Sequence, residues 1–142
     1  MNKFFTIGYG GKTPTEFANL LQASGVELVV DVRLKPHRAH LGSFVKAKTP
    51  DKGIEKILAS VGIGYLSLPE LGNPYLSEND WKEKYTKLLE AEGTERTERL
   101  RAIEERAFCL LCAEKDFKNC HRLQVAEYLL NSGTEFLEVV HL

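Results

Sequence analysis

The segment that decides the fold runs from Phe108 to Arg122 and reads FCLLCAEKDFKNCHR. It begins as an apolar run typical of a buried strand and becomes abruptly polar after Cys112. A helical pattern starts near His121, so the polar residues lie where a strand is followed by a helix. Because ligands of α/β proteins bind outside the carboxyl ends of the strands, this segment is the expected functional site.

The rest of the chain alternates predicted strands and helices. Thr13-Pro14-Thr15-Glu16 is a capping box that predicts one helix start, and Thr49-Pro50 and Ser77 indicate two more. Gly93 is expected to divide the region after Ser77 into two helices, with Thr94 capping the second. The expected strands are residues 3–7, 26–32, 63–68, 107–112 and 136–141. This β-α-β-α-β-α-α-β-α-β order predicts a single α/β domain over residues 1–142, with a mainly parallel five-stranded sheet and helices on both faces.

Composition narrows the classes of function. With 142 residues, of which 43% are hydrophobic, the chain can build the core of one domain. Its formal net charge of −1 gives no overall attraction to nucleic acid or membrane, and no apolar run reaches membrane-spanning length. Three cysteines, an odd number without a secretion signal, predict a cytoplasmic protein whose thiols are free or bound to a ligand rather than paired in disulfides.

Parallel strands bring scattered residues together, because their carboxyl ends share one edge of the sheet. Asp31 and Arg33 lie two residues apart and therefore face the same side at a strand end. The edge is expected to present Gly8-Tyr9-Gly10, Asp31, Arg33, Leu71-Gly72-Asn73, Cys112 to Lys115, and His141.

The segment from Arg33 to Lys48 is rich in basic residues and contains no acid. Either it is a solvated loop, or it is an arm that contacts phosphate groups. Phe44 is its one aromatic residue, so contact with a phosphate backbone is favoured over reading of bases. The basic residues are Arg33, Lys35, Arg38, Lys46 and Lys48, with His37 and His40 between them.

A set of short motifs in this order resembles an uncharacterised bacterial and archaeal family, domain of unknown function 488. The resemblance covers essentially the whole chain and implies a small α/β domain with these residues as its functional positions, but no established reaction. The family commonly has Ser-Arg after the proline, where this chain has His37-Arg38, so His37 does not take the role of that serine. The motifs are Thr6-Ile7-Gly8-Tyr9, Asp31-Val32-Arg33, Pro36, Leu71-Gly72, Cys112-Ala113-Glu114 and Cys120-His121-Arg122.

Three chemistries could use these residues. The amino terminus of the last helix could bind a phosphate together with Arg33, Lys115 and Arg122. Alternatively, Cys120 could act as a nucleophile, because a helix start beside Arg122 lowers the pKa of a thiol, with His121 or His141 as base. A zinc site could combine Cys112, Cys120 and His121 with His141, His37 or Asp31, although the spacing matches no compact zinc motif.

We therefore predict a polar cleft at the carboxyl ends of the strands that binds a phosphate-bearing ligand, either a nucleotide or nucleic acid. The alternatives are a thiol-dependent enzyme that uses Cys120 or Cys112, and a non-catalytic interaction module. No cofactor, metal, membrane partner or oligomeric state follows from the sequence. The candidate catalytic residues are Cys112, Cys120 and His121, and the candidate ligand-binding residues are Tyr9, Asp31, Arg33, Arg38, Glu114, Lys115 and Arg122.

Overall fold

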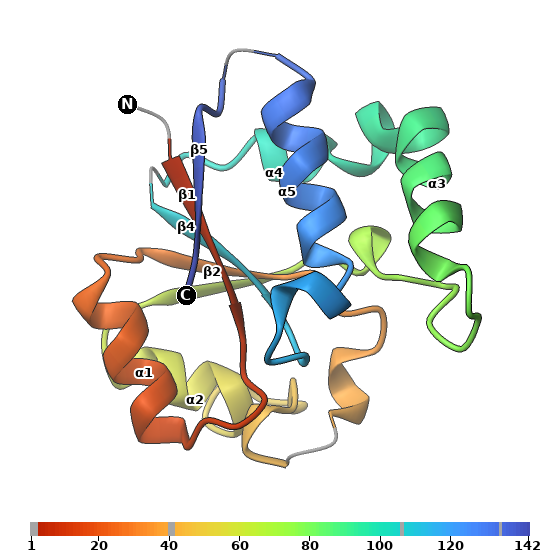
Figure 1. The fold of residues 1–142 in the computed structure, drawn as a ribbon. Helices are drawn as coiled ribbons and strands as arrows, with labels where there is room; N and C mark the ends of the chain where they lie inside the picture. Colours follow the sequence, from red (N-terminus) through yellow and green to blue (C-terminus); the bar gives the residue numbers. More distant parts are fainter. Residues whose placement is uncertain (1–2, 40–41, 106, 134) are drawn as a thin grey trace.

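The computed structural model describes residues 3–39, 42–105, 107–133 and 135–142. Its centre is a five-stranded sheet in the order β3-β2-β4-β1-β5, and every pair of neighbouring strands is parallel (Figure 1). The α/β class and the parallel sheet expected from the sequence are confirmed. The strands are β1 Lys3–Gly8, β2 Leu28–Asp31, β3 Gly64–Ser67, β4 Phe108–Cys112 and β5 Glu138–His141.

The helices cover both faces of the sheet (Figure 1). The chain moves outward from β1 through β2 to the edge strand β3, then returns to β4 beside β1 and ends at the opposite edge. Because crossovers between parallel strands are right-handed, this reversal places the early and late helices on opposite faces. One face carries α1 Pro14–Ala23 and α2 Gly53–Ala59, and the other carries α3 Trp81–Arg96, α4 Glu98–Arg101 and α5 Arg122–Asn131.

Alternate strand residues fill two hydrophobic cores. Val30 and Leu110 point toward α3 and α5, whereas Val29 and Leu111, their chain neighbours, point toward α1 and α2. All four side chains are fully buried, as expected for central strands covered on both faces. The central strands are therefore buried on both faces of the sheet.

The start of α1 is confirmed as a capping box. The Thr13 hydroxyl accepts a hydrogen bond from the Glu16 amide at 3.1 Å, and the Glu16 carboxylate accepts one from the Thr13 amide at 2.9 Å. Pro14 occupies the first position, where its missing N–H costs nothing.

Two other expected helix boundaries are wrong. Helix α2 begins at Gly53 rather than at Pro50, because the chain turns at Gly53 with φ of 66° and Ile54 donates a hydrogen bond to the Val45 carbonyl. Helix α3 begins at Trp81, after Asp80, and not at Ser77.

The predicted break at Gly93 is also wrong, because α3 continues to Arg96. A Cβ atom at Gly93 would lie 2.3 Å from Cζ of Tyr128 on α5. Gly93 therefore permits the close approach of two helices rather than ending one. Thr97, and not Thr94, precedes α4, and its hydroxyl donates to the Gly93 carbonyl.

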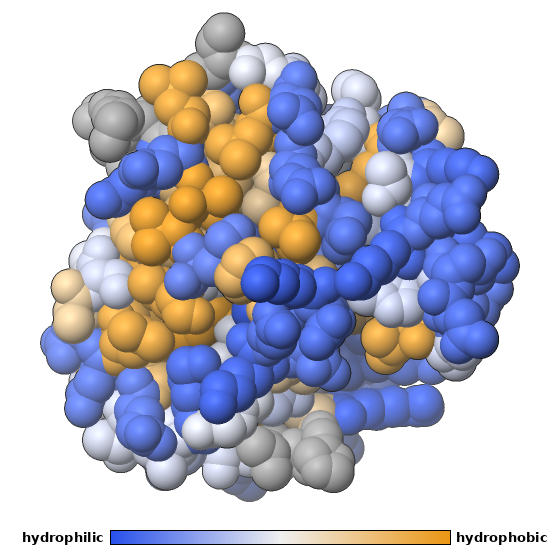
Figure 2. All heavy atoms as spheres, in the orientation of Figure 1, coloured by the Kyte–Doolittle hydropathy of each residue, from blue (hydrophilic) through white to orange (hydrophobic). Residues whose placement is uncertain are grey.

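The face of the molecule shown in Figure 2 has a hydrophilic part and an apolar part. Hydrophilic atoms cover α3, whereas apolar atoms gather over the edge of the sheet formed by β1 and β5. Ion pairs such as Lys87–Glu83, at 3.0 Å, account for part of the polar face of α3. Within the described part of the chain, no helix combines the length and the apolar character needed to cross a membrane.

We predict that Gly93→Ala destabilises the protein, although alanine has the higher helix propensity by about 1 kcal/mol. The added methyl group would collide with the Tyr128 ring. In a Tyr128→Ala background the collision disappears, so the same substitution should become neutral or stabilising. Urea unfolding of the four proteins of this cycle measures the coupling, and additive effects would contradict the packing role of Gly93.

Candidate functional site

A pocket of about 540 Å³ lies outside the carboxyl ends of the first four strands. The loops that follow β1, β2, β3 and β4 all contribute to its walls. This is where the chain reverses direction in the sheet, the usual ligand position in open α/β folds. Its lining residues are Tyr9, Arg33, Leu34, Lys35, Arg38, Ala39, Asn73, Pro74, Leu76, Ser77, Trp81, Cys112, Ala113, Glu114, Asn119, Cys120 and His121.

Asp31 and Arg33 form a buried ion pair at the end of β2. The Arg33 Nε and Nη2 atoms donate to the two carboxylate oxygens of Asp31, at 2.9 and 2.7 Å for the shorter contacts. The Arg33 amide and the Tyr65 hydroxyl also donate to this carboxylate. Burial opposes the charge on Arg33, but the hydrogen bonds and charge of Asp31 outweigh it and raise the pKa of the guanidinium.

One nitrogen of the Arg33 guanidinium has no partner among the residues that the structure describes. Nε and Nη2 face Asp31, and Nη1 is buried without an acceptor among the described residues. Arg33 is only 7% exposed and lines the pocket, so a missing acceptor is costly. Its guanidinium also lies over the Tyr9 ring, 5.4 Å from the ring centre, which fixes its plane.

Asn73 presents a second buried donor to the same pocket. Its Oδ1 accepts from the Tyr75 amide at 2.9 Å, and its Nδ2 has no acceptor in the described part of the chain. Gly72 places Asn73 there, because its Cα packs against the loop after β2: a Cβ at this position would lie 2.4 Å from the Leu34 Cα. Arg33 and Asn73, on the loops after β2 and β3, therefore both line the pocket, and each has one buried nitrogen without an acceptor in the described part of the chain.

Gly8 and Gly10 hold the end of β1 against the loop after β4. A Cβ at Gly8 would lie 1.6 Å from the Glu114 carbonyl oxygen, and one at Gly10 would lie 2.8 Å from that of Ala113. Two backbone hydrogen bonds close this contact, from Tyr9 to Cys112 and from Gly10 to Ala113. Glycine is required here for close approach of two backbones.

Arg122 is fully buried at the first position of α5. Its Nη1 donates to the Glu114 carbonyl at 2.7 Å and to Cys112 Sγ at 3.0 Å. Nε donates to the Thr6 hydroxyl at 3.3 Å, and Nη2 to the Lys115 carbonyl at 3.4 Å. Burial lowers the pKa of Arg122 to about 10, so it stays charged at neutral pH. Within the described residues all of its hydrogen-bond acceptors are neutral.

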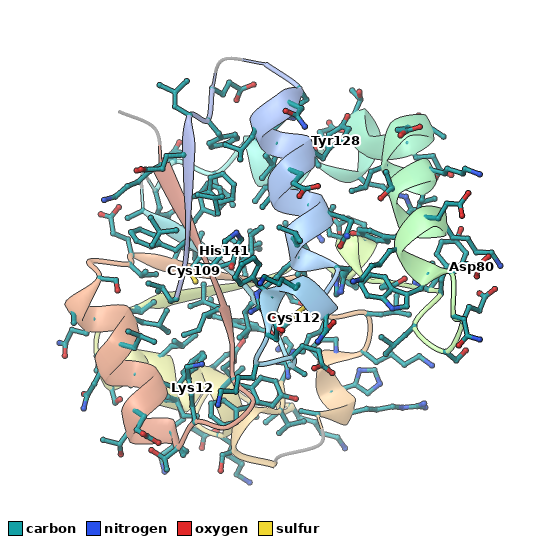
Figure 3. All side chains as sticks on the ribbon, in the orientation of Figure 1. Lys12, Asp80, Cys109, Cys112, Tyr128 and His141 are labelled. Atoms are coloured by element: carbon teal, nitrogen blue, oxygen red, sulfur yellow. A yellow bond between two sulfur atoms is a disulfide. The ribbon has the colours of Figure 1, made fainter. Side chains whose placement is uncertain are left out.

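The expectation of free or ligand-bound thiols is wrong for two cysteines. Cys112 and Cys120 form a disulfide, whereas Cys109 is free and buried within the sheet. The turn at Phe117–Asn119 carries the chain back, so that Cys120 lies beside the end of β4 although eight positions separate the two cysteines in sequence. Figure 3 shows Cys112 beside the first turn of α5 and Lys12 on the loop between β1 and α1.

His121 is buried with its ring orientation fixed. Nε2 lies 2.7 Å from the Val32 carbonyl and therefore carries the proton, which leaves a lone pair on Nδ1, 3.8 Å from Cys120 Sγ. Burial lowers the pKa of His121 to about 4. His141 lies away from the pocket: its Nδ1 is 2.6 Å from the Thr6 hydroxyl and its ring stacks on Phe117.

The structure divides the candidate residues into two groups. Seven line the pocket, and Asp31 lies behind it as the partner of Arg33. Lys115 and Arg122 do not line it; the Lys115 side chain extends along Gly11 instead. In the described residues, no three His, Cys, Asp or Glu side chains are placed to hold a metal ion. The seven are Tyr9, Arg33, Arg38, Cys112, Glu114, Cys120 and His121.

Sequence reasoning missed Asn73 and Trp81 as candidate residues. The sequence correctly predicts that Asn73 lies at this edge of the sheet. The preceding residue, Gly72, was the signal for a functional role, since a glycine beside an asparagine indicates a tight loop with a polar tip. The spacing of Trp81, Tyr85, Leu88 and Leu89 is typical of the apolar stripe of a helix, which predicts a core position for Trp81. It begins α3 and is half-buried at the pocket, which the helical pattern alone does not reveal.

Fold and pocket together define a parallel α/β protein with buried polar groups at the carboxyl ends of its strands. The family described as domain of unknown function DUF488 matches residues 13–129, and the chain belongs to this family. The resemblance seen in the sequence motifs is thus confirmed. No curated protein and no solved structure matches the chain.

We predict that Arg122→Lys lowers the free energy of unfolding by about 2–4 kcal/mol. A single ammonium group cannot replace the separate contacts that the guanidinium makes with Thr6, Glu114 and Lys115. Urea unfolding measures the loss. Arg99→Lys, at an exposed ion pair with Glu70, is the matched control and should change stability far less. Equal effects of the two substitutions would contradict the structural role of Arg122.

We also predict a pH dependence of stability that arises from His121. An unfolded histidine binds a proton near pH 6.5, whereas the folded His121 binds one only near pH 4. The unfolded state therefore binds more protons between these values, and stability falls as the pH drops through this window, by about 2 kcal/mol at pH 5. Above pH 7 the effect vanishes.

Urea unfolding at pH 7.5 and pH 5 tests this dependence. His121→Gln should lose less stability than wild type between the two pH values, and His37→Gln, at an exposed position, should behave like wild type. A wild-type slope in His121→Gln would show that His121 is not responsible.

Proposed function

We propose that the pocket binds a small phosphate-bearing ligand, most simply a nucleotide, through Arg33 and Asn73. The observation that supports this proposal is the pair of buried donors, Arg33 Nη1 and Asn73 Nδ2, that lack protein acceptors among the described residues. Leaving two such groups unsatisfied costs about 1–3 kcal/mol each, and a ligand with several acceptor oxygens removes that cost.

Charge favours an anionic ligand. Asp31 neutralises Arg33 on one edge of the guanidinium and holds its plane, so the remaining edge can donate to a phosphate oxygen in a fixed direction. Lys35 and Arg38 add two exposed cations at the rim. Glu114 is the opposing charge, and it is exposed on the cysteine side of the pocket.

Shape favours a nucleotide over a bare phosphate. A volume of about 540 Å³ lies in the range of small-molecule sites. Trp81, Leu34 and Leu76 give one wall an apolar surface against which a base or sugar could pack. A nucleic-acid strand carries the same phosphate groups as a nucleotide. Its backbone would also contact Lys35 and Arg38, the cations at the rim of the pocket.

The cytoplasm stays our proposed compartment. Its support is the free thiol of Cys109, which is enclosed in the sheet. The Cys112–Cys120 disulfide is unusual for this compartment, where such bonds are mostly transient or redox-active. In this compartment nucleotides and small thiols would be available to bind in the pocket.

The sharpest test is Asn73→Asp. This substitution keeps the oxygen that accepts from the Tyr75 amide, but replaces the Nδ2 donor with a negatively charged acceptor. Isothermal titration of inorganic phosphate, AMP, ATP and a short single-stranded oligonucleotide into wild type should detect binding of at least one. We expect Asn73→Asp and Arg33→Lys to weaken it about tenfold to a hundredfold, since one charge-assisted hydrogen bond contributes about 1.5–3 kcal/mol.

Two further variants serve as controls for the binding measurement. Glu114→Gln removes the opposing charge and should tighten binding, whereas Lys87→Glu, on the exposed side of α3, should leave it unchanged. If wild type binds none of the four probes, or if Asn73→Asp binds as tightly as wild type, the ligand proposal is wrong. The non-catalytic interaction module would then be the better interpretation.

A further inference from the structure

The disulfide Cys112–Cys120 is part of the wall of the same pocket. It joins the last residue of β4 to the residue two positions before α5, and both cysteines line the pocket. Their exposed fractions are only 3% and 4%. Because both residues line it, the pocket is the side from which a reagent would approach the sulfurs.

The surroundings of the two sulfurs differ. Cys112 Sγ accepts a hydrogen bond from the charged Nη1 of Arg122 at 3.0 Å. Cys120 Sγ accepts a weaker one from the Arg122 amide at 3.5 Å, and His121 Nδ1 lies 3.8 Å away. A neighbouring cation stabilises a thiolate, so Cys112 is the better leaving group when the disulfide is attacked.

We propose that this pocket binds a low-molecular-weight thiol carrying carboxylate or phosphate groups, and that this thiol exchanges with the Cys112–Cys120 disulfide. The proposal rests on the proposed function, because Arg33, Asn73 and the rim cations would hold the anionic groups of the thiol. No other cysteine takes part: Cys109 faces the core beside α1 and α2, and burial raises the pKa of its thiol.

The exchange has two balanced steps. The thiolate of the small molecule attacks Cys120 Sγ, the S–S bond breaks, and its electron pair leaves on Cys112 as a thiolate beside Arg122. A second thiolate attacks the small-molecule sulfur of the mixed disulfide and releases Cys120. In total, two small thiols are oxidised to one small disulfide, and the protein disulfide takes up two electrons and two protons.

The pocket should distinguish small thiols by their charge and prefer anionic ones. Cations at the mouth of a pocket raise the local concentration of anions and the rate of their encounter by tenfold or more. An anionic thiol should therefore reduce the disulfide faster than a neutral or cationic thiol of equal intrinsic reactivity. Arg38, exposed at the rim, is the residue at which this preference can be changed with least effect on the core.

The experiment compares reduction of the folded protein, residues 1–142, by glutathione, 2-mercaptoethanol and cysteamine. Each rate is divided by the rate of the same thiol with an unstructured disulfide peptide, and alkylation followed by mass spectrometry reports the protein dithiol. We expect a normalised preference for glutathione of about tenfold that Arg38→Glu removes and Lys87→Glu retains. Equal normalised rates for the three thiols in wild type would overturn the proposal.

A trapping arm identifies the attacked sulfur in the wild-type protein. Brief reaction of the oxidised protein with glutathione is quenched with N-ethylmaleimide, and peptide mass spectrometry locates the glutathione on one cysteine and the alkyl group on the other. We expect glutathione on Cys120 and the alkyl group on Cys112, because the leaving thiolate lies beside Arg122. Glutathione on Cys112 would contradict the assigned order of attack.

S-methylglutathione separates this proposal from the preceding one, because it has the charges of glutathione but no thiol. If it binds by calorimetry and slows reduction by glutathione, both proposals are supported. If it binds and leaves reduction unchanged, the anion site stands and the exchange proposal fails. If neither it nor the phosphate probes bind, the proposed function itself fails.

Discussion

The buried guanidinium of Arg122 is the interaction on which the carboxyl edge of the sheet depends. It connects three parts of the chain: Thr6 on β1, Cys112 at the end of β4, and the carbonyl groups of Glu114 and Lys115 in the following loop. Four neutral acceptors solvate the charge in place of water. Removing such a donor leaves several buried acceptors unpaired, which is why a single side chain can fix the geometry of a whole loop.

The other constraints at this edge act on the same loop. Gly8 allows the backbones of β1 and the loop to touch, and the Cys112–Cys120 disulfide ties the two ends of the loop together. The loop therefore presents Glu114 and Asn119 to the pocket from a fixed backbone. Across the pocket, the Asp31–Arg33 pair and the Gly72–Leu34 contact fix the opposite wall in the same way.

The fold was predictable from sequence because its signals are local or periodic. Apolar runs marked the strands, and the capping box at Thr13 marked the start of α1. The predictions failed where tertiary contacts outweigh local rules: Gly93 is accommodated within a helix because Tyr128 packs on it, and Pro50 precedes a turn fixed by Gly53 and Val45. The disulfide was missed because a count of cysteines says nothing about which sulfurs the turn after β4 brings together.

The candidate site shows the same limit more sharply, in its two arginines. Arg33 and Arg122 are both expected near the carboxyl edge of the sheet, and the sequence alone does not distinguish a ligand-binding arginine from a structural one. Arg33 has a carboxylate partner, Asp31, which occupies one edge of its guanidinium and leaves Nη1 unpartnered within the described chain. Among the described residues Arg122 has neutral acceptors only, and each guanidinium nitrogen donates to at least one of them. The arginine that is paired with an acid thus keeps one nitrogen without a partner among the described residues, whereas each guanidinium nitrogen of Arg122 contacts the surrounding fold.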